Sequence, residues 1–117
     1  MFVKSLNNII CMNRGDTWST SIPINIGSTA DPEYYNLTAN DYVYFGVMEP
    51  EKSFEHSIVC KKLDINNVTK ENYVDITFDS IDTEYLQPGI YYYEVKLLRP
   101  NDVVDTIIPK TKVIVVD

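Results

Sequence analysis

Apolar and polar residues alternate with a period of two along much of this chain, as they do in strands with one buried face. The alternation is clearest over residues 17–26, 73–79, 90–97 and 112–116, which we predict as strands. Less regular apolar runs predict four more strands, at residues 6–12, 42–48, 57–63 and 103–108. Pro23 cannot donate to a neighbouring strand, so it places its segment at a sheet edge or a bulge.

Turn-forming residues separate these segments. The longest connection, residues 27–40, contains Asp31-Pro32 and is predicted to be a loop with a short turn. Asp82 is predicted to cap a single helical turn. Short strands spaced by about 8–14 residues are typical of an antiparallel two-sheet β-sandwich. At 117 residues, the chain is expected to form one domain over residues 1–117.

Composition supports a folded sheet protein. Val, Ile, Thr, Tyr and Phe are abundant, whereas alanine occurs only twice, which disfavours helices. Hydrophobic residues make up 44% of the chain and charged residues 23%, which is ordinary for a globular protein. No apolar run is long enough for a membrane-spanning helix, and no secretory signal is visible at the N-terminus.

The net charge is −7, with the acidic residues spread along the chain. This charge disfavours binding to nucleic acids and to anionic membranes, since both are negatively charged. Two interpretations of it stay open: a solvated surface, or an acidic face for a basic partner.

Two cysteines, Cys11 and Cys60, lie in predicted strands between apolar residues and are expected to be buried free thiols. A disulfide between them requires α-carbons within about 7 Å, a distance that only the tertiary structure decides. Synthesis in a reducing cytoplasm fits this cysteine content.

Candidate catalytic residues are few. His56 is the lone histidine, and no nucleophile motif accompanies it. The pairs Glu49/Glu51 and Asp79/Asp82 have the residue types of a glycosidase dyad, but such pairs arise by chance among seventeen acidic residues. The glycines are isolated and form no phosphate-binding loop. We therefore expect no enzyme activity, no catalytic residue and no cofactor.

Two further motifs have simple structural explanations. Asp64 begins a segment like a calcium loop, but its sixth position is Thr69 rather than glycine, so we expect a turn and no metal site. Arg14-Gly15-Asp16 matches an integrin-recognition tripeptide and is interpreted as a hairpin turn in which glycine supplies the turn dihedral.

The nine tyrosines are the least ordinary feature of the composition. Tyrosine is favoured at protein–protein contacts, because it buries a large area at low entropic cost. Tyr34 and Tyr35 fall in the long loop, and Tyr92 points away from the inward face of its strand. They are either ordinary filler of strands and loops or the centre of a partner-binding surface.

One constellation favours an immunoglobulin-like version of the sandwich. Pro88-Gly89 forms a turn that leads into a strand opening with an inward Tyr91. This arrangement resembles a tyrosine corner, in which the phenol packs over the core edge and its hydroxyl bonds a nearby backbone group. With Trp18 on the apolar face of an earlier strand, these residues are expected to define the fold, without indicating a function.

The order of several segments resembles the N-terminal immunoglobulin-like domain of siphophage baseplate upper proteins. The segments that carry the resemblance are 14–17 with the strand after it, 41–48, 82–97, and 105–108 with 112–115. The resemblance covers nearly the whole chain. Those proteins usually continue into a linker and a receptor-binder-holding region, whereas this sequence stops at Asp117 after its last predicted strand.

The resemblance implies a virion protein without an active site, made in the bacterial host, that docks on the tail, baseplate or fibre base. Decoration of the head through the major capsid protein is the alternative. A host-directed binding module or inhibitor is an alternative of another class. With its net charge of −7 and no large apolar stripe, the isolated protein is expected to be monomeric.

Overall fold

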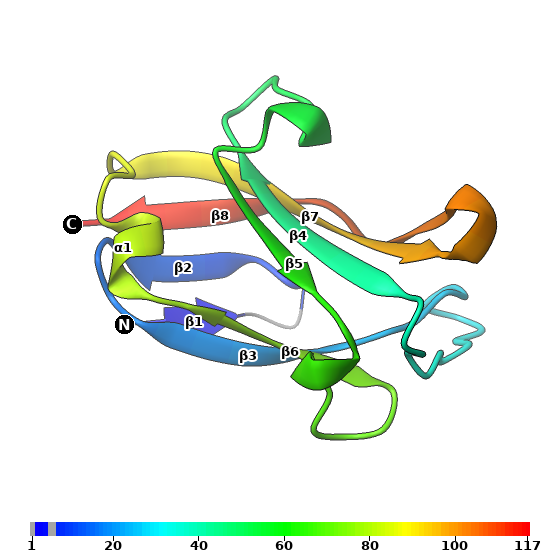
Figure 1. The fold of residues 1–117 in the computed structure, drawn as a ribbon. Coiled ribbons are helices and arrows are strands. Elements are labelled where there is room, and N and C mark those ends of the chain that lie inside the picture. Colours follow the sequence, from blue (N-terminus) through cyan, green and yellow to red (C-terminus); the bar gives the residue numbers. More distant parts are fainter. Residues whose placement is uncertain (1, 5–6) are drawn as a thin grey trace.

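The computed structural model describes residues 2–4 and 7–117, which fold mostly into strands (Figure 1). The strands are β1 (Phe2–Lys4), β2 (Ile10–Asn13), β3 (Trp18–Pro23), β4 (Tyr42–Met48), β5 (Val59–Leu63), β6 (Tyr73–Phe78), β7 (Gly89–Arg99) and β8 (Val103–Val116). One helical turn and three 3₁₀ turns connect them: α1 (Ser80–Thr83), η1 (Phe54–His56), η2 (Ile65–Asn67) and η3 (Pro100–Asp102).

The strands form two sheets, with the smaller packed across the core from the larger (Figure 1). The large sheet has the order β1-β2-β8-β7-β4-β5, and β3 pairs with β6 in the small one. All pairings are antiparallel except that of β2 with β8, which is parallel. The expectation of a wholly antiparallel fold is therefore wrong at this pair. A short hairpin makes its strands antiparallel, but no such turn joins β2 and β8.

Aromatic rings from both sheets meet in the core. Trp18 of β3 stacks on Phe78 of β6 at 4.5 Å between ring centroids and meets Phe45 of β4 edge-on at 6.3 Å. On the other side of Phe45, the ring of Tyr93 stacks at 4.9 Å. The Trp18 indole N–H donates to Met12 Sδ at 3.0 Å, so its polar atom is satisfied. Trp18 thus lies at the centre of the fold, as the sequence indicated.

The period-two pattern correctly identifies the buried face of the regular strands. Residues 74, 76 and 78 of β6 and residues 93, 95 and 97 of β7 are buried, whereas their neighbours face outward. The same holds for Trp18 and Ile22 of β3. Pro23 ends β3 in a two-stranded sheet, where every strand is an edge, as expected.

Two strand predictions need correction. Residues 103–108 and 112–116 belong to one continuous strand, β8, because the Pro109 region is accommodated as a bulge. Register shifts opposite residues 93–96 of β7 mark this irregularity. The strand predicted over residues 6–12 begins only at Ile10, and its first residue lies outside the described residues.

Two turn predictions also change in detail. The helical turn exists, but its N-cap is Asp79, whose backbone N–H donates to Asp82 Oδ2 at 2.8 Å. Arg14-Gly15-Asp16 is not a hairpin, since β2 and β3 lie in different sheets. Gly15 does supply the turn dihedral, with φ of 81°.

Candidate functional site

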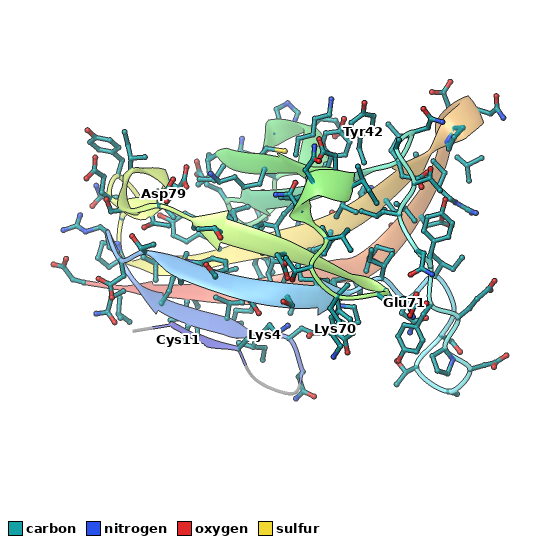
Figure 2. The ribbon with its side chains drawn as sticks, turned by 60° about the horizontal axis from the view of Figure 1, so that its bottom comes forward. Lys4, Cys11, Tyr42, Lys70, Glu71 and Asp79 are labelled. Carbon is teal, nitrogen blue, oxygen red and sulfur yellow. The ribbon has the colours of Figure 1, made fainter. Side chains whose placement is uncertain are left out.

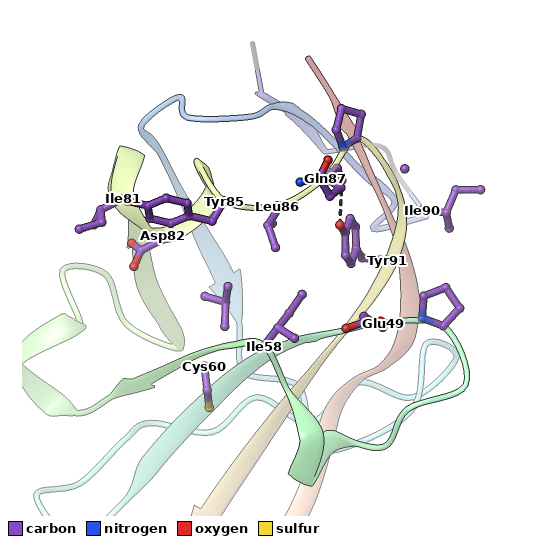
Figure 3. Close-up of a pocket in the computed structure, with 14 residues that line it drawn as sticks. Glu49, Ile58, Cys60, Ile81, Asp82, Tyr85, Leu86, Gln87, Ile90 and Tyr91 are labelled. Atoms are coloured by element: carbon purple, nitrogen blue, oxygen red, sulfur yellow. Dashed lines mark hydrogen bonds between the residues drawn. The ribbon is translucent and has the colours of Figure 1, made fainter.

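A groove of about 820 Å³ opens at one end of the sandwich (Figure 3). One wall is the segment from α1 to the start of β7, and the other is formed where β4 ends and β5 begins. Leu86 packs at its floor as part of the hydrophobic core. The groove therefore lies where apolar residues of the interior reach the surface.

Four large apolar side chains line the groove while remaining exposed to solvent. Ile81 is 66% exposed and Tyr85 80% exposed, and Ile58 and Ile90 are close to half exposed. In Figure 3, Tyr85 and Ile58 lie between the two walls, whereas the Ile90 side chain is on the far side of β7 and points away from the opening. Exposed apolar residues that gather on a monomer, rather than scatter, mark surfaces that bind a partner.

Buried hydrogen bonds fix the wall that carries Ile81 and Tyr85. Thr83 is fully buried, and its hydroxyl accepts the backbone N–H of Gly15 at 3.1 Å. Its carbonyl accepts the backbone N–H of Leu86 at 3.0 Å. The exposed side chains are thus presented by a short segment that closes a turn on itself and is tied to the β2–β3 connection at Gly15.

The predicted tyrosine corner holds the end of this wall. The Tyr91 hydroxyl donates to the Gln87 carbonyl at 2.7 Å, which is the kind of bond that the sequence predicted (Figure 3). Gly89 starts β7 with φ of 154°, a conformation that residues with a Cβ rarely adopt. Pro88 and Gly89 both line the groove, so the turn that starts β7 also shapes the candidate site.

The charges of the groove are acidic. Glu49 and Asp82 line it, and its described lining includes no lysine or arginine. Lys61 contacts Asp82 at 2.7 Å, while Glu49 has no ion-pair partner among the residues that the structure describes. Burial alone would raise the pKa of Asp82, but hydrogen bonds from Lys61 and the Asp79 backbone outweigh it and lower that pKa. The groove therefore combines an apolar surface with two acidic side chains.

His56, Asp79 and Asp82, which were considered for catalysis, lie in short hydrogen-bonded turns. Ser53 donates to Glu55 at 2.6 Å and lies 3.0 Å from His56 Nδ1, all on the exposed turn η1. The Ser53 hydroxyl has one hydrogen, which goes to the carboxylate in this arrangement rather than to the imidazole. Asp79 and Asp82 form the cap of α1.

The candidate calcium loop is a capped turn. The Asp64 carboxylate accepts the backbone N–H of Asn66 at 2.9 Å, and the Asn67 side chain accepts that of Asp64 at 3.0 Å. These bonds begin η2 and use the oxygens that a cation would need. Across residues 2–4 and 7–117, no group of three or more His, Cys, Asp or Glu side chains could hold a metal ion.

The three tyrosines predicted to bind a partner do not lie together. Tyr34 is exposed in the long loop, and Tyr35 beside it packs against the core. The Arg99 guanidinium lies over the Tyr35 ring, 5.5 Å from its centroid. Tyr92 is seven residues from Arg99 along β7, which separates them by about 23 Å. The structure thus places Tyr92 on a different surface from the other two.

Tyr35 belongs to a hydrogen-bonded network at the end of the sandwich opposite the groove. Its hydroxyl donates at 2.8 Å to Asp41, whose carboxylate is fully buried. The same Oδ2 atom accepts the Thr38 backbone N–H at 2.7 Å and the Thr38 hydroxyl at 2.9 Å. Burial would raise the pKa of Asp41, but these hydrogen bonds and the charge of Arg99 lower it. We call these three residues, Tyr35, Thr38 and Asp41, the polar plug, and they close the end of the molecule opposite the groove.

Both cysteines are free thiols, but neither is fully buried. Cys11 is half-buried, and Cys60 is exposed on β5, so the prediction of buried thiols is wrong for Cys60. β5 is an edge strand, and Cys60 faces away from the core, opposite Gly46. Four strand spacings, about 19 Å, separate β2 from β5, which is too far for a disulfide.

The four exposed apolar side chains of the groove were not predicted as a site from the sequence. One signal was present at Ile90, an apolar residue in the outward phase of the alternating strand. A second was the pair Ile81 and Tyr85, which lie four residues apart within an otherwise acidic turn. Alternation alone did not reveal that these residues meet Ile58, because the two walls are more than twenty residues apart in sequence.

Comparison with known proteins finds no protein-family model and no curated protein that matches this chain. No helix in the described part of the chain is long and apolar enough to cross a membrane.

Proposed function

We propose that this chain is a non-enzymatic, immunoglobulin-like docking domain of a phage particle, which binds another structural protein of the tail, baseplate or fibre base. The packing of two sheets and the Tyr91–Gln87 hydrogen bond support the immunoglobulin-like assignment. The virion assignment is supported by the order of motifs that resembles the N-terminal domain of baseplate upper proteins.

The apolar groove is the observation that carries the docking proposal. Ile81 and Tyr85 expose most of their surface to water and lie together at one groove, which makes them more than scattered surface residues. Tyrosine and isoleucine in this setting supply contact area on a wall that hydrogen bonds already hold in place. A preorganised wall lowers the entropic cost of binding.

The partner segment that fits this groove is apolar and carries lysine or arginine. Its apolar side chains would cover Ile58, Ile81 and Tyr85, and its cation would meet the unpaired carboxylate of Glu49. Many copies held on one symmetric particle would convert a modest single contact into a stable attachment.

Immunogold electron microscopy of phage particles, with antibody against this protein, tests the location. Label at the tail tip or along the tail is the expected result. Label spread over the head would replace the tail proposal with capsid decoration. Absence of label from both would contradict a virion role and favour the host-directed binder.

Groove variants test the mechanism in the same particles. Ile81→Ser combined with Tyr85→Ser is expected to remove most of the label, because the partner loses its apolar contacts. Ile65→Ser changes another exposed isoleucine, on η2 and outside the groove, and serves as the control. Equal loss in both variants would contradict docking through the groove. Light scattering of the isolated wild-type domain is expected to give a monomer.

A further inference from the structure

The outer face of the large sheet carries alternating aromatic and basic side chains. The inward residues of β4 and β7 join the core, so Tyr44 and Lys96, which pair across these strands, point to the opposite side. On β5, Lys62 lies opposite Tyr44 in the same way. We call this surface the Tyr–Lys face and define it by Tyr42, Tyr44, Lys62, Tyr92, Lys96, Lys110 and Lys112.

Two lysines of this face lie over its tyrosine rings, and between them Phe54 of η1 packs against Gly46 and Lys96. Lys62 Nζ is 4.1 Å from the ring centroid of Tyr42 and 6.0 Å from that of Tyr44. At the other end of the face, Lys110 lies 5.7 Å from the ring of Tyr92. Each pair holds a positive charge in place above a ring, so a partner meets an ordered surface.

The face is basic although the protein is acidic. It holds four of the eight lysines of the chain, and Glu94, the acidic residue among its outward strand positions, already lies 3.9 Å from Lys96. The net charge of the whole chain is −7. Glu55 of η1 also lies close enough to Lys96 to interact with its charge, so two carboxylates partly neutralise that lysine.

The outer face of the small sheet differs, since it is mostly small and polar and has a single such pair, Tyr73 beneath Lys70, at one end. Ser19 and Thr77 hydrogen-bond across β3 and β6 at 2.9 Å, and Ser21 donates to Asp75 at 2.5 Å. These small polar groups satisfy one another, and they keep that face compatible with water. Most of this outer face is thus built from small polar side chains, whereas the outer face of the large sheet carries several tyrosines and lysines.

We propose that the Tyr–Lys face is a second docking surface, which binds an acidic protein surface, so that the domain bridges two components of the particle. Charge complementarity selects the partner, because carboxylates would pair with lysines that have few acids of their own nearby. The tyrosines would supply apolar contact area between those charges. This proposal rests on the proposed virion function, and it assigns Tyr92 to this face rather than to the loop of Tyr34 and Tyr35.

Site-specific crosslinking in assembled particles tests it. A photoreactive phenylalanine analogue replaces Tyr44 on the face, Tyr85 in the groove, or Tyr73 as the matched control. Tyr73 also lies beneath a lysine, Lys70, at 4.4 Å, but belongs to β6 of the small sheet. Figure 2 shows Tyr42 and Lys70 well apart on the molecule, so the control samples a separate surface.

The expected result is a crosslink from position 44 to a segment of net negative charge, a crosslink from position 85 to a different segment, and none from position 73. Lys62→Glu with Lys96→Glu should lower the yield at position 44 about tenfold and leave position 85 unchanged. Lys70→Glu should change neither yield.

Crosslinking at position 85 but not at position 44 would overturn the second surface and leave the groove intact. A basic or neutral segment captured at position 44, or a yield that the double charge reversal does not lower, would overturn it as well. If neither position crosslinks in purified particles, both the second surface and the proposed docking function fail.

Discussion

The two ends of the molecule, about 33 Å apart along β7, differ in which side chains they bury and which they expose. At the C-terminal end of β7, a fully buried carboxylate accepts three hydrogen bonds and closes the core. At the N-terminal end of β7, the apolar side chains of Ile81 and Tyr85 are exposed to water in a groove that Glu49 also lines. At the first end, which we call the closed end, the buried carboxylate stabilises the fold. At the second, which we call the open end, the exposed apolar side chains do not stabilise the isolated domain. The difference separates residues that hold the fold from residues available for binding.

The closed end should be the more sensitive to substitution. Asp41→Ala removes a buried carboxylate that accepts from the Thr38 backbone N–H and the Tyr35 hydroxyl, so the free energy of unfolding should fall by about 3 kcal/mol. Urea denaturation measures this loss. Asp31→Ala, at an exposed position of the same loop, should stay within about 0.5 kcal/mol. An Asp41→Ala effect as small as that would show that the plug is not structural.

The closed end should also make the free energy of unfolding depend on pH. The pKa of Asp41 is lowered in the folded protein, so its ionised form stabilises the fold above the unfolded value of 3.8, and this stability is lost as pH falls through the lower folded value. Asp75 and Asp82 act in the same direction. Urea titrations between neutral and acidic pH should therefore show a less steep acid loss in Asp41→Asn than in the wild type. Identical slopes would contradict the assignment to Asp41.

The tyrosine corner, which borders the open end, should contribute an intermediate effect. Tyr91→Phe removes the hydroxyl that donates to Gln87, and the free energy of unfolding should fall by about 1 kcal/mol. Tyr85→Phe, whose exposed hydroxyl lies on the same wall, is the matched control and should leave thermal unfolding unchanged. A larger effect at Tyr85 would mean that the wall depends on this exposed side chain.

The open end itself should be nearly neutral for stability. Ile81→Ser with Tyr85→Ser should change the free energy of unfolding by no more than about 0.5 kcal/mol, since both side chains are already in water. Leu37→Ser at the closed end, where the side chain is buried, should cost about 3 kcal/mol. Equal decreases in melting temperature for the two variants would contradict the difference in stability between the two ends.

Local pattern accounts for much of the fold. The alternation around residues 73–79 and 90–97 identified which side chains of β6 and β7 face the core, because a strand has a strict period of two. The Pro88-Gly89-x-Tyr91 spacing likewise predicted a hydroxyl-to-backbone bond, since both partners lie within five residues. The segments 103–108 and 112–116 were predicted as two strands but belong to one, because a bulge near Pro109 shifts the register without ending β8.

The composition of the groove and of the Tyr–Lys face depends on which segments, distant in the sequence, lie side by side in the fold. Tyr34, Tyr35 and Tyr92 looked alike in the sequence, yet one is exposed, one bonds Asp41 and one lies under Lys110. Local spacing determined the strands and their inward faces, because these follow from backbone geometry over a few residues. Only the tertiary structure decided the parallel β2–β8 pair, the groove and the Tyr–Lys face, because each joins residues whose proximity comes from sheet order and register across the whole chain.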